Sequence, residues 1–352
     1  MSDNFAFILL NWYAKNKRSL PWREEKNPYK IWISEIILQQ TRVSQGLNYY
    51  IRFIERFPSI SSIYEAGEQE VLKYWQGLGY YTRARNIYAA AVYLMENYQG
   101  KFPTTYNEIL KIKGIGEYTA AAIASFAYQL PYAVIDGNVL RVLSRIFGVY
   151  EPIDSTKGKK EIRQLANKLM CKKNPSAFNQ AIMDFGATQC APANPDCKNC
   201  CFSNVCYANL HYEQTELPVK TKKIKTRNRY FYYFHISYQN KIYIQKRKSK
   251  DIWKGLYEFP LLELDETIDC EKLIAHPAVQ NLFTNLNWEI LSVSSTYKHI
   301  LSHQTIIAVF INISVDKAIN NADFIPISFD RIADYPISRL MEKYLEKITV
   351  MS

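Results

Sequence analysis

The sequence predicts a protein of two domains, an all-α domain over residues 1–212 and an α+β domain over residues 229–352, joined by a basic linker over 213–228. Apolar side chains recur at helical spacing in the first part, whereas β-rich runs follow residue 229. Between them, LPVKTKKIKTRNR (217–229) carries six basic residues and no acid, which is typical of a solvated linker. A length of 352 residues also favours two domains.

Individual elements follow from these patterns. Helical periodicity predicts helices over 31–41 (IWISEIILQQT), 85–98 (RNIYAAAVYLMENY) and 118–128 (YTAAAIASFAY), with glycines and prolines between them. In the second domain, strands are expected over 230–238, 241–247 and 305–315, with a turn at 238–240. Helices are expected over 269–276 and 336–348, and Cys171 and Cys270 are expected to be core thiols.

The net charge of +11 favours a polyanionic partner, nucleic acid before membrane, although a merely basic protein is the alternative. No run of 18 apolar residues and no signal-peptide layout is present, so we expect an intracellular protein. All five histidines lie at or after position 211. Chemistry in the first domain must therefore use carboxylates, tyrosines, lysines or a metal.

Four cysteines form the pattern Cys190-x6-Cys197-x2-Cys200-x5-Cys206. A disulfide set is not expected in a chain without a secretory signal. Structural zinc sites usually have two short pairs of ligands, whereas this run has one CxxC and no nearby histidine. Four thiolates at this spacing also satisfy a [4Fe–4S] cluster. The spacing alone therefore favours neither group over the other. Cys201 stands beside Cys200 as a competing ligand.

Three further features are candidates for phosphate binding or catalysis: a glycine hairpin and two acidic residues. KIKGIGEYTAAAI (111–123) predicts a helix, a Gly-x-Gly hairpin and a second helix, in which Gly114 and Gly116 allow positive φ and admit a phosphate to backbone amides. The alternative is an ordinary turn. Glu35 follows Ser34 on a predicted helix, so it is either a functional acid or a first-turn acid behind a cap. Asp136 follows an apolar run and is either a functional acid or a helix cap.

These features together resemble the endonuclease III superfamily of helix-hairpin-helix DNA glycosylases. Within it, LPWR (20–23), YKIWISEIILQQT (29–41), GLGYYTRARN (77–86) and DGNVLRVLSR (136–145) resemble the MutY adenine glycosylases, over about residues 5–210. The resemblance implies a helix-hairpin-helix glycosylase domain with an iron–sulfur loop over 190–206. It also implies a [4Fe–4S] cluster on Cys190, Cys197, Cys200 and Cys206.

The resemblance further implies an enzyme of base excision repair that removes adenine opposite 8-oxoguanine or guanine in double-stranded DNA. Glu35 matches the acid that protonates adenine N7, and Asp136 matches the carboxylate that stabilises the oxocarbenium ion, electrostatically or as an adduct. Tyr118 and Asn138 match residues that hydrogen-bond within this group. The remaining matches are the adenine pocket (Trp22, Arg23, Leu38, Gln180) and the wedges in the duplex (Gln40, Tyr80). DNA-backbone contacts are expected at the hairpin (Gly114, Gly116) and at Lys198, which lies between two of the cysteines.

At the position where lyase members carry a nucleophilic lysine, this chain has Tyr118, so a monofunctional enzyme is expected. IWKGLYEFP (252–260) resembles the NUDIX-like domain of MutY proteins, but no acidic helix follows it, so pyrophosphate hydrolysis is not expected. YKHILSHQT (297–305) resembles the loop that senses 8-oxoguanine, with Ser302 and His303 as readers and Leu301 in place of the usual phenylalanine.

The alternatives are a bifunctional endonuclease III-like glycosylase/lyase, a non-catalytic iron–sulfur DNA-binding protein, and a NUDIX nucleotide hydrolase. The resemblance implies a monomer of the bacterial cytoplasm, associated with the nucleoid and without a membrane partner. A monovalent cation on carbonyls of the 111–116 hairpin is also implied by the resemblance.

Overall fold

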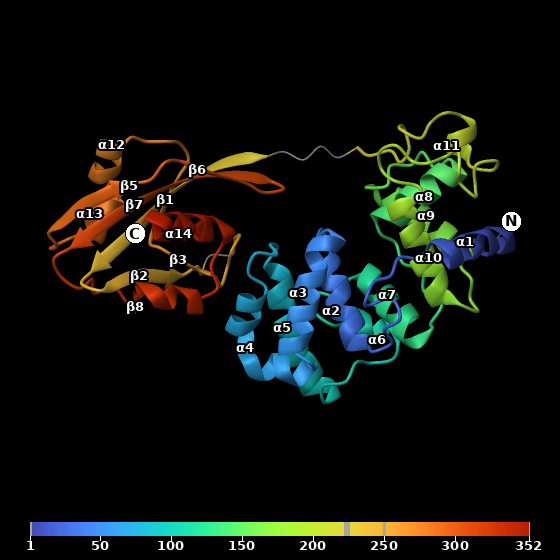
Figure 1. The fold of residues 1–352 in the computed structure, drawn as a ribbon, viewed down its shortest axis with the longest axis horizontal. Helices are drawn as coiled ribbons and strands as arrows, with labels where there is room; N and C mark the ends of the chain where they lie inside the picture. The colour runs from blue at the N-terminus through green and yellow to red at the C-terminus, as the bar shows by residue number, and fades with distance from the viewer. Residues whose placement is uncertain (1, 222–225, 249–250, 352) are drawn as a thin grey trace. The chain divides into compact units, whose positions relative to one another are not determined.

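The computed structural model describes residues 2–221, 226–248 and 251–351, so part of the predicted linker, 222–225, lies outside the described residues. The chain forms two compact units. One comprises Met1–Glu65 and Asn86–Lys222, and the other comprises Ala66–Arg85 and Lys223–Ser352. Figure 1 shows the helices and strands of the two units, and each unit has its own hydrophobic core.

The first unit is helical, as predicted, and the expected helices over 31–41, 85–98 and 118–128 correspond to α2, α5 and α7. Its core contains large aromatic side chains that are almost fully buried, including Trp32, Phe53 and Phe185. The helices up to the linker are α1 (Ser2–Asn16), α2 (Pro28–Leu38), α3 (Val43–Arg56), α4 (Ile60–Tyr74), α5 (Thr82–Tyr98), α6 (Tyr106–Leu110), α7 (Glu117–Tyr128), α8 (Gly137–Phe147), α9 (Thr156–Leu169), α10 (Pro175–Thr188) and α11 (Tyr207–Leu210).

The second unit is built on a mixed sheet, which confirms the predicted α+β class. The strand order is β3-β2-β1-β7-β5, and the long strands β1 and β7 pair in parallel from Arg227–Gln304 to Ser237–Ser314. The strands are β1 (Arg227–Tyr238), β2 (Lys241–Lys246), β3 (Tyr257–Glu258), β4 (Leu261–Leu264), β5 (Trp288–Val293), β6 (Tyr297–Ile300), β7 (Gln304–Val315) and β8 (Phe324–Ser328). The helical elements are α12 (Cys270–Ala275), α13 (Pro277–Leu282), the short 3₁₀ turn Phe329–Asp334 and α14 (Arg339–Met351).

Helices pack on both faces of this sheet, because β1 and β7 alternate their buried side chains between the two sides. On one face, Phe310 of β7 stacks on Tyr344 of α14 with ring centroids 4.0 Å apart. On the other face, Phe234 of β1 packs against Phe283, which follows α13, within a buried apolar cluster. The expected strands and helices of this unit are all present.

Residues 66–85, at the end of α4 and the start of α5, fall with the second unit although the sequence pattern groups them with the helical domain. α4 is broken at Gly67, whose φ of 78° is outside the helical region. Beyond the break, Lys73 Nζ donates to the carbonyl of Tyr335 (3.2 Å). Arg85 Nη1 donates to the carbonyl of Lys254 (2.6 Å). Hydrogen bonds to distant backbone carbonyls do not depend on the spacing of apolar residues along the helix. The sequence pattern therefore does not predict them.

Two expectations about single residues are wrong. Cys270 is exposed at the start of α12, and Cys171 lies beyond the end of α9 and is half-buried, so neither is a core thiol. Both cysteines lie close to a helix end, where fewer neighbouring elements cover a side chain than in the middle of a packed helix. No helix in the described ranges is long and apolar enough to cross a membrane.

Candidate active site

Glu35 lies in the middle of α2 with its side chain buried. The helix begins at Pro28, and Asn27 caps it by accepting a hydrogen bond from the amide of Tyr29. The alternative of a first-turn acid behind a Ser34 cap is therefore wrong, because the cap is seven residues earlier than Ser34. Removal of the carboxyl from water raises the pKa of Glu35. A carboxyl in this state keeps its proton at higher pH than an exposed glutamate.

Asp136 is the N-cap of α8, so the capping role is confirmed. Its carboxylate accepts the amide N–H of Val139 (2.8 Å) and the side-chain amide of Asn138 (2.8 Å). An N-cap needs one carboxylate oxygen, and Asn138 binds the other. Asp136 is half-buried at the point where the chain enters α8. Asn138 thus orients Asp136, as the sequence predicted.

Tyr118, in the first turn of α7, hydrogen-bonds to one of the two carboxyls and lies near the charge of the other. Its hydroxyl donates to Glu35 Oε2 (2.5 Å). Burial, and then the charges of Glu35 and Asp136, hold the pKa of Tyr118 well above its usual range. The phenol therefore stays neutral and serves as a hydrogen-bond donor. No amine occupies this position after the hairpin.

The surroundings of the two carboxyls differ in the number of donors. Desolvation raises the pKa of Asp136, and Val139, Asn138 and Arg141 oppose that shift. For Glu35, the hydroxyl of Tyr118 and the charge of Arg23 lower the pKa, whereas the charge of Asp136 raises it. The donors around Asp136 favour its anion, and the charge of Asp136 raises the pKa of Glu35. The pair is suited to act as one acid and one anion.

Of the residues that match an adenine pocket, Arg23 lies close enough to Glu35 for its charge to lower the pKa of that carboxyl. Gln180 of α10 donates to the carbonyl of Arg23 (3.1 Å) and accepts from the hydroxyl of Tyr13 (2.8 Å). Trp22 is buried next to Arg23, and Leu38 ends α2 half-buried. Nε of Arg23 is buried and finds no hydrogen-bond partner within the described part of the chain. A buried donor without a partner fits a site that binds a polar ligand.

Asp184 of α10 was not predicted and holds this wall together. It is fully buried and accepts from Nε (2.9 Å) and Nη2 (2.6 Å) of Arg18, and from Nη2 of Arg23. The signal that could have found it is an acid within the apolar run AIMDFGA (181–187), the same kind of signal that singled out Asp136.

Replacing Asp184 with Asn is expected to lower the free energy of unfolding by about 3 kcal/mol, because two guanidinium groups would face a neutral amide. Urea denaturation followed by circular dichroism measures this loss. Asp265→Asn, at an exposed acid, is the matched control and should stay within about 0.5 kcal/mol of the parent. Equal small losses in both variants would show that Asp184 does not anchor the wall.

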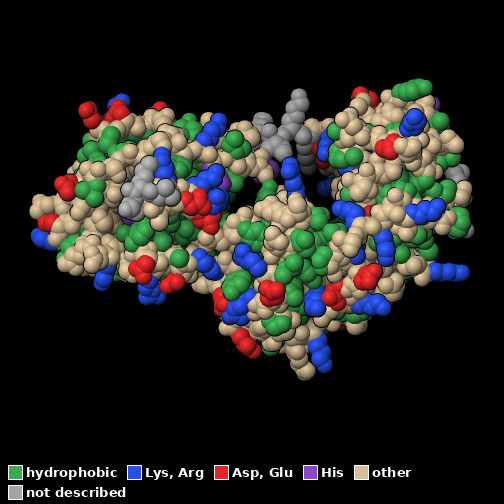
Figure 2. All heavy atoms as spheres, viewed as in Figure 1, with side chains coloured by type: hydrophobic (Ala, Val, Ile, Leu, Met, Phe, Trp, Pro, Cys, Tyr) green, Lys and Arg blue, Asp and Glu red, His purple; other side chains and the backbone are tan. Residues whose placement is uncertain are grey.

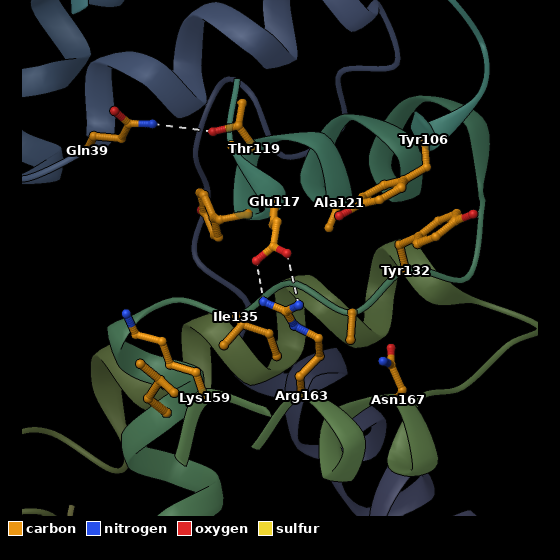
Figure 3. A pocket seen from close by; sticks show the side chains of 14 residues that line it. Gln39, Tyr106, Glu117, Thr119, Ala121, Tyr132, Ile135, Lys159, Arg163 and Asn167 are labelled. Carbon is orange, nitrogen blue, oxygen red and sulfur yellow. Dashed lines mark hydrogen bonds and ion pairs between the residues drawn. The ribbon is translucent and has the colours of Figure 1, made fainter. Parts of the chain in front are cut away.

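The two residues that match wedges share an unusual backbone state. Gln40 and Tyr80 have φ of 55° and 49°, in the left-handed region that residues other than glycine seldom adopt. Both side chains are exposed. Gln39, between Leu38 and Gln40, donates to Thr119 of α7 (3.3 Å; Figure 3), which fixes this turn to the hairpin helix.

In the second unit, Tyr80 meets the loop that contains the two expected readers. Its hydroxyl hydrogen-bonds to Oγ of Ser302. Tyr80, Trp253, Ser302 and His303 line one cavity of about 400 Å³. Ser302 and His303 are exposed at its edge. The structure therefore brings one expected wedge and both expected readers together.

The hairpin before α7 uses its two glycines differently. Gly114 has φ of 82°, and a Cβ there would lie 2.5 Å from Cβ of Asn86, so only glycine fits. Gly116 has φ of −93° and is the N-cap of α7, so the expected positive φ is wrong at this position. The absence of a side chain at Gly116 leaves the amides of the helix start open to a ligand. Lys198, the third expected backbone contact, is exposed in the cysteine loop.

The four expected ligand cysteines line one small cavity, and all are free thiols. The exposed Cys201 is not part of its lining. Among the described residues, no three His, Cys, Asp or Glu side chains are close enough to hold a single metal ion. A zinc ion needs four sulfurs at about 2.3 Å from one centre, whereas a four-iron cluster separates its thiolates. The donor set consists of four thiols around one cavity, which are the ligands that a [4Fe–4S] cluster takes.

Arg141 of α8 connects the cysteine loop with the catalytic group and was not predicted. Its Nε donates to the carbonyl of Cys190 (2.9 Å), and its Nη2 donates to Oδ1 of Asn138 (3.0 Å) and to the carbonyl of Gly186 (2.7 Å). Arg145, one turn later, donates to Sγ of Cys190 (3.5 Å). The cysteine loop thus supports the residue that orients Asp136.

Comparison with known proteins gives two family matches. A model described as an HhH-GPD superfamily base excision DNA repair protein matches residues 33–172, and a NUDIX domain model matches residues 232–347. In the NUDIX part, α12 contains one acidic residue, Glu271. It therefore lacks the several glutamates of the helix that binds metal in NUDIX hydrolases. The predicted two-part architecture is confirmed.

Solved structures share the fold of the helical part. A thermostable thymine-DNA glycosylase superposes with a TM-score of 0.56 at 29% identity, covering 60% of this chain and 97% of that one. Endonuclease III in a non-covalent complex with DNA superposes with a TM-score of 0.53 at 21% identity, covering 60% of this chain and 98% of that one.

Sequence relatives extend over nearly the whole chain. The adenine DNA glycosylase of Buchnera aphidicola subsp. Schizaphis graminum is 35% identical over 347 residues, which are 97% of this chain and 98% of that protein. The human adenine DNA glycosylase is 38% identical over 222 residues, which are 60% of this chain and 41% of that protein. The chain belongs to the adenine DNA glycosylases, enzymes of the helix-hairpin-helix base excision repair superfamily.

Proposed function

We propose that this enzyme is a monofunctional glycosylase that hydrolyses the N-glycosidic bond of adenine paired with 8-oxoguanine or with guanine in double-stranded DNA. The observation that carries the proposal is the pair of carboxyls: Tyr118 hydrogen-bonds to Glu35, and Asp136 lies close enough for its charge to raise the pKa of both Glu35 and Tyr118. Glycoside hydrolysis needs an acid for the leaving group and an anion for the sugar cation. The two carboxyls supply both without a histidine.

Glu35 supplies the proton for the leaving base. As the bond between C1′ and N9 breaks, its electron pair moves into the adenine ring, and a proton from Glu35 to N7 neutralises that charge. The raised pKa of Glu35 keeps the proton available. Arg23, with its unpartnered Nε, is placed to donate to the base in the same pocket.

Asp136 stabilises what remains of the sugar. Loss of the base leaves an oxocarbenium ion at C1′, and the carboxylate of Asp136 stabilises that cation directly or as a transient adduct. Water then adds to C1′ and completes hydrolysis, and the proton it releases returns the acid site to its starting state. Asn138 holds one oxygen of Asp136 and fixes its direction.

A bifunctional lyase and a non-catalytic DNA-binding protein are the two competing functions. A lyase of this superfamily forms a Schiff base between a lysine and C1′, and Tyr118 has no amine for that step. A binding protein has no use for two carboxyls withdrawn from water, which lower affinity for a polyanion. Both alternatives are therefore less well supported than hydrolysis.

We expect DNA to bind along the hairpin amides of Gly114 and Gly116 and at Lys198, contacts that do not depend on sequence. On the face shown in Figure 2, Lys and Arg side chains are spread over both units. Gln40 and Tyr80 would enter the duplex where adenine leaves the stack, which costs a few kcal/mol. With genomic DNA as its substrate, the enzyme would act as a monomer at the bacterial nucleoid in the cytoplasm.

Ser302 and His303 are proposed to read the 8-oxoguanine partner. The double substitution Ser302→Ala/His303→Ala is expected to reduce the preference for 8-oxoguanine:A over G:A by about tenfold, because each polar contact to a base edge contributes about 1–3 kcal/mol of discrimination. Single-turnover rates on the two duplexes measure that preference. Ser292→Ala, on exposed β5, is the control. An unchanged preference in the double variant would exclude this loop from recognition.

The cysteines are proposed to hold a [4Fe–4S] cluster that supports the loop around Lys198 and takes no part in hydrolysis. The purified protein should contain about four iron atoms per chain and absorb broadly in the violet. Cys197→Ser should lower the iron content and weaken DNA binding, whereas Cys270→Ser should change neither. A colourless protein that contains zinc would refute the cluster.

Release of free adenine is the direct test of the proposed function. The enzyme is incubated with duplexes that contain 8-oxoguanine:A, G:A or T:A, and the released base is quantified by chromatography. We expect adenine from the first two duplexes and none from the third. Release of thymine or cytosine, or of no base, would contradict the proposal.

A further inference from the structure

A second cavity of the first unit, of about 520 Å³, opens beside the start of α7 (Figure 3). We call it the side chamber, defined by Tyr106, Tyr132, Lys159, Arg163 and Asn167 together with Gly116–Thr119. Tyr118 forms part of its wall, whereas Trp22, Arg23, Leu38 and Gln180 do not line it. The chamber therefore adjoins the catalytic group at Tyr118, and its lining differs from the residues expected to hold adenine.

One wall of the side chamber is an aromatic platform. The rings of Tyr106 and Tyr132 stack with centroids 4.2 Å apart and an interplanar angle of 9°. Tyr132 remains 38% exposed, so part of its side chain is accessible to a ligand, and Figure 3 shows it beside Tyr106 in the wall of the cavity. Unstacked nucleobases bind to such faces, because every base has a π-face that stacks on an aromatic ring.

The opposite wall presents polar groups along one face of α9. Lys159, Arg163 and Asn167 recur at four-residue spacing, which places them on the same side of the helix. Arg163 pairs with Glu117 across the chamber (Nη1 to Oε1, 2.9 Å), as Figure 3 shows. The ammonium of Lys159 pairs with no carboxylate within the described residues, and the amide of Asn167 has no hydrogen bond there. A free cation suits a phosphate, and a free amide suits a base edge.

We propose that the side chamber receives the base of a nucleotide that neighbours the extruded adenine in the same strand. The base stacks on Tyr132, its edge meets Asn167, and its phosphate lies at Lys159. This inference rests on the proposed function. Successive nucleotides of one strand are about 3.4 Å apart along the duplex axis, so a nucleotide next to adenine is within reach of a chamber that shares Tyr118 with the catalytic site.

The consequence concerns extrusion and leaves the chemistry unchanged. A neighbouring base that stacks on Tyr132 no longer stacks in the duplex. It therefore no longer stabilises the state in which adenine is stacked inside the helix. Stacking on an aromatic side chain offsets part of the stacking lost from the duplex. The side chamber should therefore increase affinity for the extruded state and have no effect on bond cleavage.

A double-mutant cycle between protein and DNA tests this inference. The full chain carries Glu35→Gln to prevent turnover, and its equilibrium affinity is measured for 8-oxoguanine:A duplexes. In one duplex the base on the 5′ side of adenine is replaced by an abasic spacer, and in another the base on the 3′ side. Tyr132→Ser is expected to weaken binding of the intact duplex about tenfold, and Tyr132→Phe, which keeps the ring, by less than about twofold. With the spacer on one of the two sides, the effect of Tyr132→Ser should disappear.

Matched variants on α9 complete the test. Lys159→Gln should weaken binding and reduce its salt dependence by about one counterion, whereas Lys160→Gln, at the next exposed position, should do neither. If Tyr132→Ser does not fold, Asn167→Ala replaces it in the cycle. An equal effect of the Tyr132 or Asn167 variant on all three duplexes would overturn the inference. That result leaves the proposed function intact, because the proposed function is tested separately by release of adenine from the parent enzyme.

Discussion

Replacing Glu35 with Gln is expected to lower the single-turnover rate of adenine excision by about a thousandfold or more, with DNA affinity unchanged within a few-fold. Glutamine has the size of glutamate and can still accept the hydrogen bond from Tyr118, so the pocket keeps its shape. It has no proton for adenine N7. Quenched-flow or manual time courses with enzyme in excess measure the rate, and a filter-binding titration measures the affinity.

The pH dependence provides a second readout of Glu35. The acid must be protonated, so the rate should fall as pH rises through its pKa, which burial has raised. The hydroxyl of Tyr118 lowers that pKa, so Tyr118→Phe should move the alkaline limb of the profile to higher pH. A Glu35→Gln rate near that of the parent, or a Tyr118→Phe profile moved to lower pH, would remove Glu35 from the role of acid.

Replacing Asp136 with Asn is expected to slow excision by about a thousandfold, because the sugar cation loses its anion. Asparagine is as good an N-cap as aspartate, so α8 should remain capped through the amide of Val139. The free energy of unfolding should therefore change by less than about 1 kcal/mol. Single-turnover rates and urea denaturation of the same preparation measure both quantities.

Asp136→Ala is the control that separates capping from catalysis. It removes the cap as well as the charge, so it should lose about 1 kcal/mol of stability in addition to the activity. If Asp136→Asn is nearly as active as the parent and only Asp136→Ala is impaired, the residue is a cap and nothing more. The mechanism proposed for the sugar cation would then be wrong.

The catalytic carboxyls illustrate how far the sequence alone predicts a site. An acid next to an apolar run needs a hydrogen-bond partner or a function, which is why the sequence singles out Asp136. The structure gives Asp136 two partners, because it caps α8 and accepts a hydrogen bond from Asn138. Glu35 was ambiguous, because its position in the helix depends on where α2 begins. The cap at Asn27 settles that question, and the short-range pattern around Ser34 did not reveal it.

The residues that sequence reasoning missed share a physical cause. Asp184 binds Arg18 across 166 positions of the chain, and Arg141 binds the carbonyl of Cys190 across 49 positions. A hydrogen bond to a distant partner leaves no local periodicity. The packing of residues 66–85 with the second unit was missed for the same reason, since Lys73 and Arg85 bond to carbonyls of residues more than 160 positions away. Helices and strands were predicted more completely, because their periods are local.

Strand breakage at the site of the lesion tests the central claim most directly. A duplex with 8-oxoguanine opposite adenine is labelled on either strand, incubated with the enzyme, and analysed with and without hot alkali. A monofunctional hydrolase that uses Glu35 and Asp136 should give breakage of the adenine strand only, and only after alkali, which cleaves at the abasic site. Breakage without alkali, breakage of the 8-oxoguanine strand, or an intact adenine strand after alkali would contradict it.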